Sequence, residues 1–289
     1  MSGTTLPETI HLPPDHTRHN LSIAAIVIYG VFLPLVWLIE YAVAWSDWVS
    51  KKRERLDWRV PLFIFFDFLS LLCIIRIIGS ALYLSTSSPS TGVFIVQTLF
   101  SSLGYMPMVM KLLLILQRII RKAPDQSSLV LVGRALILVR VILSVGVILI
   151  IAGASTLILA LWKAGSMVVV VAFLLLGSIH ICLLLPTRWH NALPKGGNRG
   201  LAVAATALPP LLVRAVYFIV LEFSEDGKYH PVTGDPGYLV GLGYTMELLV
   251  IISLLSATIV SEELPWFNQR VDYGKITRQK SSDGPDNHA

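Results

Sequence analysis

Residues 206–221 read TALPPLLVRAVYFIVL, an apolar run that contains a double proline and a single charged residue, Arg214. A helix that spans a bilayer needs about 20 mainly apolar residues, and the run around this stretch extends over about 201–221. A charge inside such a run is costly in hydrocarbon unless a partner or water compensates it. The stretch therefore predicts a membrane helix, and Arg214 predicts a buried polar site within it.

The whole chain has the composition of an integral membrane protein. Of its 289 residues, 54% are hydrophobic and 14% are charged, whereas a soluble domain has about 25% charged residues. The net charge is +5, but the basic residues fall in the loops between apolar runs, as membrane topology requires. We therefore expect a lipid bilayer and no nucleic acid as partner, in the endoplasmic reticulum or plasma membrane. The oligomeric state stays open.

Seven apolar runs are long enough to cross a bilayer, so the sequence predicts an all-α bundle of seven transmembrane helices. The third run contains Pro107, and the fourth and fifth are separated only by residues 162–164, which predicts a tight hairpin there. The Pro209–Pro210 pair predicts a kink over 205–210. The seven predicted spans are about 21–43, 60–84, 93–116, 135–161, 165–185, 201–221 and 238–260.

The orientation follows from the lysines and arginines of the loops. Three loops are rich in these residues: 44–59 has five, 117–134 has four and 186–200 has three. The loops that alternate with them along the chain have none or one. This alternation places the N-terminus outside or in the lumen and the C-terminus in the cytosol. The chain then divides into a polar N-terminal segment (1–20), a membrane domain (21–265) and a polar tail (266–289) that we expect to be disordered.

The depth of each charge can be estimated from the 1.5 Å rise per helical residue. Arg214 lies about 20 Å along the sixth span, Arg76 at a similar level of the second, and Glu247 about 14 Å along the seventh, which runs the other way. Two arginines and one glutamate thus share a layer in the outer half, where Tyr244 and Tyr217 lie within a turn and offer hydroxyl groups. This excess of positive charge is suited to an anion or an electron-rich oxygen, and we expect a small hydrophobic or anionic ligand as a partner.

Two interpretations of this layer stay open. Arg76, Arg214 and Glu247 form either a buried bridge that fixes helix packing or a polar pocket for a ligand. Glu222 or the acidic loop at 222–236 offers a second counter-charge. In a binding role the arginines would hold an anionic or carbonyl group, and Glu247 would orient them.

A second polar layer lies toward the cytosolic side. Glu40 ends the first span, Asp67 lies near the start of the second, and Lys111 and Arg140 lie near the inner ends of the third and fourth. Asp67 paired with Lys111 or Arg140 is the simplest account. The longer side chains also reach the interface by snorkelling, so we interpret this layer as structural.

Several families and sites are excluded by their motifs. The seventh span has no lysine, which excludes a retinal protein of the microbial type, and neither the third nor the seventh span ends as in G-protein-coupled receptors. The sequence has no HExxH, nucleophile elbow or phosphate-binding glycine loop. Cys73 and Cys182 lie inside apolar runs without metal-binding spacing. We expect neither a metal nor another cofactor.

Three segments carry a resemblance: LLCIIRIIGSALY at 71–83, TALPPLLVRAVY at 206–217 and GYTMELLVIISLL at 243–255. They resemble a family of uncharacterised fungal seven-span proteins. That family has Arg-Ile-x-Gly in the second helix, Leu-Pro-Pro-x-x-x-Arg in the sixth and a glutamate in the seventh. The resemblance covers roughly residues 21–265 and implies a fungal source and a seven-helix fold, without an activity.

A weaker resemblance is to the small fungal membrane-bound terpene cyclases of meroterpenoid pathways, a form of secondary metabolism. It implies that intramembrane carboxylates protonate the substrate, with Glu247 or Asp67 as general acid and Glu40 as a further candidate. Four phenylalanines would then offer π faces to a carbocation: Phe63, Phe65, Phe66 and Phe68. Buried arginines near a carbocation are unfavourable, and the cyclases are typically shorter. Whether the protein is an enzyme stays open.

Overall fold

The structure is a computed structural model, and every regular element in its described part is a helix. This confirms the all-α prediction. Parts of the prediction lie outside the described residues: the N-terminal segment up to residue 15, the first residues of the second and third predicted spans, and the tail. The described ranges are 16–50, 67–85, 104–123, 129–156, 158–185, 195–224 and 235–261, with single positions at 100, 127, 189, 192 and 193.

The helices follow the predicted spans in order, with shifted ends. The first begins at His16 rather than 21 and continues to Ser50, because polar residues extend a membrane helix beyond its apolar part. The described helices are α1 (His16–Ser50), α3 (Phe68–Ser85), α5 (Tyr105–Arg121), α6 (Val130–Thr156), α7 (Leu159–Leu184), α9 (Lys195–Ala205), α10 (Leu208–Phe223), α11 (Pro236–Tyr238), the π-helix η2 (Leu239–Thr245) and α12 (Met246–Ser261).

Six helical stretches of the described residues are long and apolar enough to cross a membrane: His16–Trp45, Phe68–Ser85, Val130–Thr156, Leu159–Leu184, Gly196–Phe223 and Pro236–Ser261. The chain is therefore a multi-pass membrane protein by the length and hydropathy of its helices. The outward faces of α1, α6 and α7 are apolar, as lipid contact requires, with exposed residues such as Val31, Leu138, Ile148 and Val171. The remaining predicted span corresponds to α5, which has 17 described residues.

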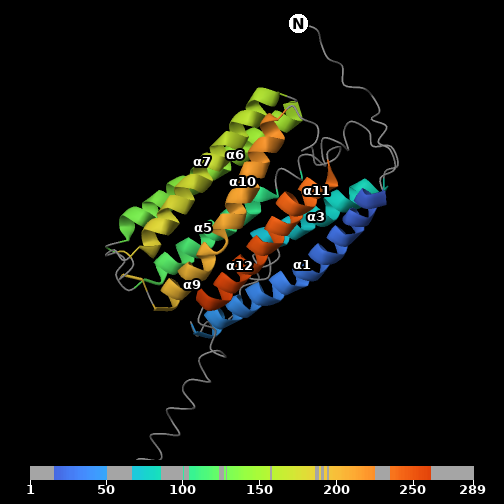
Figure 1. Cartoon of the computed structure of the whole chain (residues 1–289). Coiled ribbons are helices and arrows are strands. Elements are labelled where there is room, and N and C mark those ends of the chain that lie inside the picture. The colour runs from blue at the N-terminus through green and yellow to red at the C-terminus, as the bar shows by residue number, and fades with distance from the viewer. Residues whose placement is uncertain are drawn as a thin grey trace, which may run out of the picture.

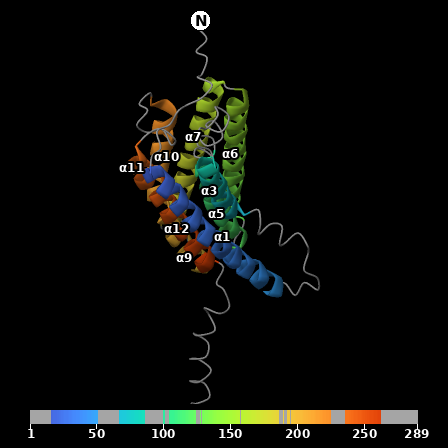
Figure 2. The same ribbon diagram turned by 90° about the vertical axis from the view of Figure 1, so that its right-hand side faces the viewer.

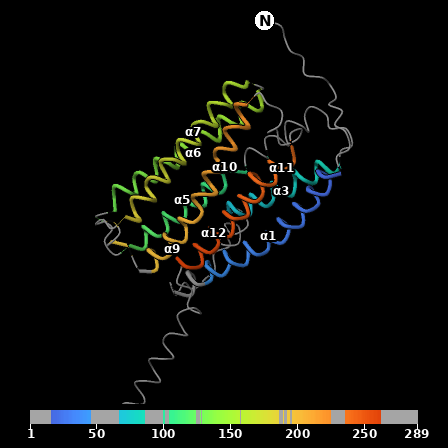
Figure 3. The backbone as a smooth tube through the Cα atoms, in the orientation of Figure 1, coloured from blue at the N-terminus to red at the C-terminus, as the bar shows by residue number. Residues whose placement is uncertain are grey.

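α5 lies at the centre of the bundle. It packs against α3, α6, α7, α9, α10 and α12, and most of its residues are buried. Figure 1 shows α6 and α7 side by side at one edge and α1 at the opposite edge, where α1 covers α3 and α12. Figure 2 shows α1 tilted across the bundle, and the tube in Figure 3 shows the long helices running along one common direction. Polar side chains of α5 are thereby enclosed by protein.

The hairpin between the fourth and fifth spans differs from its prediction. The chain reverses between Thr156 and Leu159, so Trp162 and the two residues after it lie inside α7 instead of forming a turn. Small residues allow this close pairing, because a Cβ on Gly146 would come within 2.6 Å of Val169. Trp162 and Lys163 suggested a loop because both are typical of a membrane interface. Both residue types are also compatible with a helix, and α7 continues through them.

Two irregularities flank the polar layer of the bundle. The kink predicted by Pro209–Pro210 is present as a break between α9 and α10, with both prolines in the first turn of α10, where their missing N–H groups are not needed. In the last span, seven residues form η2, which ends two residues before Glu247, and the Thr245 hydroxyl donates to the Val240 carbonyl five residues back at 2.9 Å. π-turns of this kind are frequent at functional sites.

Candidate functional site

Glu247 is the centre of a buried group of polar side chains at the junction of α3, α10 and α12. It lies in the first turn of α12 and is 0% exposed. Arg76 of α3 binds it with both arms of its guanidinium group: Nε donates to Oε2 at 2.8 Å, and Nη2 donates to Oε1. This two-point contact is the strongest arrangement of an arginine and a carboxylate.

Arg214 of α10 shares the same carboxylate. Its Nε donates to Oε1 of Glu247 at 3.1 Å, and its Nη2 lies 2.9 Å from that oxygen. Arg214 is 2% exposed and Arg76 is 4% exposed, so both guanidinium groups lie within the protein. The structure thus brings together the three charges that the depth estimate assigned to one layer. Arg214 also takes part in further interactions.

Tyr29 of α1 completes the contacts of Glu247. Its hydroxyl donates to Oε2 at 2.7 Å, which joins a fourth helix to the group. The sequence interpretation missed this residue, although its position in the middle of the first apolar run was a usable signal. We call Tyr29, Arg76, Arg214 and Glu247 the Glu247 cluster.

The two tyrosines predicted near this layer lie against the guanidinium groups. The Cζ atom of Arg76 is 5.4 Å from the centroid of the Tyr244 ring, and that of Arg214 is 5.1 Å from the Tyr217 ring. Both distances fit cation–π contacts. The rings of Tyr29 and Tyr244 also meet edge to face at 6.2 Å. Aromatic faces therefore help to fix the orientation of both arginines.

The beginning of α5 lies against the Glu247 cluster. Gly104 leaves room for Arg76, since a Cβ at that position would lie 2.7 Å from Nη2 and 3.1 Å from Cζ. The next residue, Tyr105, is 0% exposed; its ring stacks on Phe218 of α10 and meets Phe173 of α7 edge to face. Its hydroxyl has no hydrogen-bond partner within the described residues.

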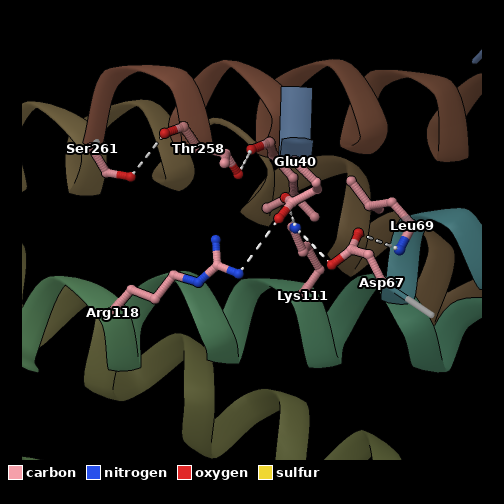
Figure 4. A network of polar contacts seen from close by, with 8 residues as sticks. Glu40, Asp67, Leu69, Lys111, Arg118, Thr258 and Ser261 are labelled. Carbon is pink, nitrogen blue, oxygen red and sulfur yellow. Dashed lines mark hydrogen bonds and ion pairs between the residues drawn. The ribbon is translucent and has the colours of Figure 1, made fainter. Parts of the chain in front are cut away.

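A second group of charges lies further along α5, as Figure 4 shows. Lys111 is 0% exposed, and its Nζ donates to Glu40 of α1 and, at 2.8 Å, to Oδ1 of Asp67. Arg118, seven residues along the same helix, reaches Oε2 of Glu40 at 3.5 Å. The other oxygen of Asp67 accepts from the backbone N–H of Leu69 at 3.1 Å. We call Glu40, Asp67, Lys111 and Arg118 the Lys111 cluster.

Of the two predicted partners of Asp67, Lys111 is the one that contacts it, and no described contact joins Arg140 to these residues. It lies on an exposed part of α6, while Arg118 takes the second basic position. The position of Arg140 along its span suited a contact with Asp67, but Arg140 lies on the face of α6 that is directed away from the bundle. The spacing of seven residues between Lys111 and Arg118 places both on one helix face and could have identified Arg118. It was overlooked because the third span was expected to end at 116.

Neither cluster resembles a metal site. Within the described ranges, no group of three or more His, Cys, Asp or Glu side chains is arranged to hold a metal ion. Both clusters instead combine carboxylates with arginine or lysine, which are donors suited to oxygen acceptors.

Residues 16–264 match the family model described as Domain of unknown function (DUF7702). The chain belongs to this family. No curated protein and no solved structure matches the chain. The family covers all the residues of both clusters and carries no assigned activity.

Proposed function

We propose that the Glu247 cluster is the binding site of a multi-pass membrane protein that binds or senses a small molecule with an anionic or carbonyl oxygen. The observation that carries the proposal is the sharing of one buried carboxylate by two guanidinium groups from different helices. Guanidinium groups prefer planar oxygen pairs. Ionisable side chains at bilayer depth are functional candidates because their burial is costly.

Each residue of the cluster has a distinct role in this proposal. Arg76 and Arg214 hold the ligand oxygen, and Glu247 keeps their two guanidinium groups close together despite their like charge. Tyr29 fixes Glu247 from α1 through its 2.7 Å hydrogen bond. Tyr244 and Tyr217 support the faces of the guanidinium groups. Such preorganisation lowers the entropy cost of ligand binding.

The contacts favour this binding role over the cyclase-like one. Glu247 accepts hydrogen bonds from two guanidinium groups, and Asp67 accepts one from Lys111 at 2.8 Å. Both carboxylates are therefore engaged as hydrogen-bond acceptors of cations, and the positive charge of the two guanidinium groups repels a carbocation. A role in secondary metabolism and a fungal source stay predictions from resemblance.

The membrane arrangement that we propose has seven crossings, with the N-terminus outside and the C-terminus in the cytosol. The central position of α5 supports a seventh crossing, because a helix enclosed by the others shares their direction. The basic loops support the orientation. Protease protection of tags at both termini in sealed microsomes tests it, and protection of both tags, or of neither, would contradict an odd number of crossings. The endoplasmic reticulum or plasma membrane remains the predicted location.

The binding proposal is tested with purified protein in lipid nanodiscs, by thermal unfolding with increasing laurate or inorganic phosphate. At a ligand concentration 100 times Kd, a ligand that binds only the folded state stabilises it by about 2.7 kcal/mol. We expect at least one oxyanion to raise the melting temperature of the wild type. Dodecanol, which has the same chain as laurate without the charge, should not.

The variant Arg214→Gln should lose this response while it retains the fold, because Arg76 still pairs with Glu247. Arg140→Gln, an exposed position on α6, is the matched control and should respond as the wild type does. An equal response to dodecanol, or a full response in Arg214→Gln, would contradict the proposal.

A further inference from the structure

Tyr105 combines two properties that rarely occur together. Its side chain is completely buried, and its hydroxyl has no hydrogen-bond partner in the described part of the chain. Buried hydroxyl groups are normally satisfied, because an unsatisfied one destabilises the fold. A phenylalanine would avoid this penalty in a purely apolar environment. The hydroxyl therefore points to a partner beyond the described residues, such as a ligand.

The surroundings of Tyr105 place this partner at the Glu247 cluster. The preceding residue, Gly104, touches the guanidinium group of Arg76. The ring of Tyr105 stacks at 5.8 Å on Phe218, which is one helical turn after Arg214 on α10. An oxygen acceptor beside Tyr105 would therefore lie next to the helix segments that carry the two arginines.

The other neighbours of Tyr105 define the rest of the ligand. Phe218 and Phe173 are buried and apolar, with Phe173 meeting the tyrosine ring edge to face at 5.8 Å. Both rings pack against the ring of Tyr105 and give this place an apolar side. A strongly hydrated ion would lose its water here without replacement. A molecule with an oxygen-rich head and an apolar body keeps both parts in suitable surroundings.

We infer that Tyr105 is a ligand-binding residue, and that the ligand is an amphiphilic carboxylate whose head accepts hydrogen bonds from the Tyr105 hydroxyl and the arginines. The inference rests on the proposed function and specifies its ligand class. The carboxylate of Glu247 already shows that the two guanidinium groups accept such a head.

The test compares Tyr105→Phe with the wild type in nanodiscs, with laurate as the probe and its binding measured by calorimetry. A hydrogen bond to a charged group corresponds to a change in Kd of about tenfold or more. We expect Tyr105→Phe to bind laurate at least about tenfold more weakly. Its melting temperature without laurate should be unchanged or higher, because an unsatisfied buried hydroxyl is removed. Tyr41→Phe, at an exposed site on α1, should match the wild type in both measurements.

The alternative outcomes separate this inference from the proposed function. Unchanged laurate binding in Tyr105→Phe, with binding lost in Arg214→Gln, overturns the inference alone. A wild type that responds to inorganic phosphate but not to laurate also overturns it alone. A lower melting temperature in Tyr105→Phe that accounts for the weaker binding shows a structural residue and overturns it. A wild type that responds to no oxyanion overturns both.

Discussion

The two charge clusters lie along the same central helix but differ in their balance of charge. In the Lys111 cluster, two carboxylates meet one ammonium group, and Arg118 brings the cations to two. In the Glu247 cluster, two guanidinium groups meet one carboxylate among the described contacts. The Lys111 cluster therefore has equal numbers of positive and negative charges. Such a balance is expected of a buried salt bridge that holds helices together.

The difference separates a structural site from a binding site in physical terms. Removing one partner from a balanced buried network leaves an uncompensated charge, so such a network stabilises the fold strongly without a ligand. The Glu247 cluster has features that packing alone does not explain: the room left by Gly104, the hydroxyl of Tyr105 without a partner among the described residues, and the π-helix that ends two residues before Glu247. These features are expected where part of the set of partners is supplied by a ligand.

The largest effect is expected from Lys111→Met. The change leaves the carboxylates of Glu40 and Asp67 buried without their main partner, which destabilises a protein by about 3–5 kcal/mol. Thermal unfolding of the detergent-purified variant should show a much lower melting temperature, or no folded protein at all. The triple variant with Glu40→Gln and Asp67→Asn should regain part of the loss, because the uncompensated charges are removed.

Arg214→Gln provides the comparison between the clusters, since it still leaves Arg76 paired with Glu247. We expect its melting temperature to fall much less than that of Lys111→Met. Equal losses in the two variants would mean that both clusters are structural, and the distinction between them would be wrong.

An intermediate effect is expected from Gly104→Ala. Its backbone is helical, with φ at −57°, so the added methyl group acts only by its contact with the guanidinium group of Arg76. Overpacking of this kind destabilises by about 1–3 kcal/mol, and here it also displaces Arg76 from Glu247. Laurate binding should weaken together with the melting temperature.

Gly30→Ala is the matched control for this variant. A Cβ at Gly30 meets nothing within 4 Å, so only the higher helix propensity of alanine remains, which stabilises by up to about 1 kcal/mol. If Gly104→Ala raises the melting temperature as Gly30→Ala does, Arg76 does not need the space that Gly104 leaves.

The sequence predicted the apolar helices and grouped three of the charges. Apolar runs fix the spans because the bilayer sets their length, and the constant rise of a helix converts residue number into depth. This estimate placed Arg76, Arg214 and Glu247 in one layer, and the structure joins them by hydrogen bonds. The proline pair likewise predicted the break before α10, because two consecutive residues without an N–H group cannot lie inside a regular helix.

The faces of the helices could not be predicted in the same way. Which residues of two helices meet depends on their rotation and crossing angle, and these are set by packing over the whole bundle. Arg140 therefore appeared suitable by depth but lies on an exposed part of α6. Tyr29 was missed for the same reason, since its place in the first apolar run indicates a buried hydroxyl but not that α1 directs it to Glu247.

The smallest effect is expected from Arg118→Gln. The Arg118 side chain is 36% exposed, its contact with Glu40 is 3.5 Å, and Glu40 keeps Lys111 as its closer partner. Exposed ion pairs contribute about 0–1 kcal/mol and are screened by salt. The variant should lose less than about 1 kcal/mol of stability, and the loss should shrink in high salt during unfolding in detergent. A loss as large as that of Lys111→Met would mean that the exact balance of charge, rather than the burial of Lys111 between two carboxylates, holds this cluster together.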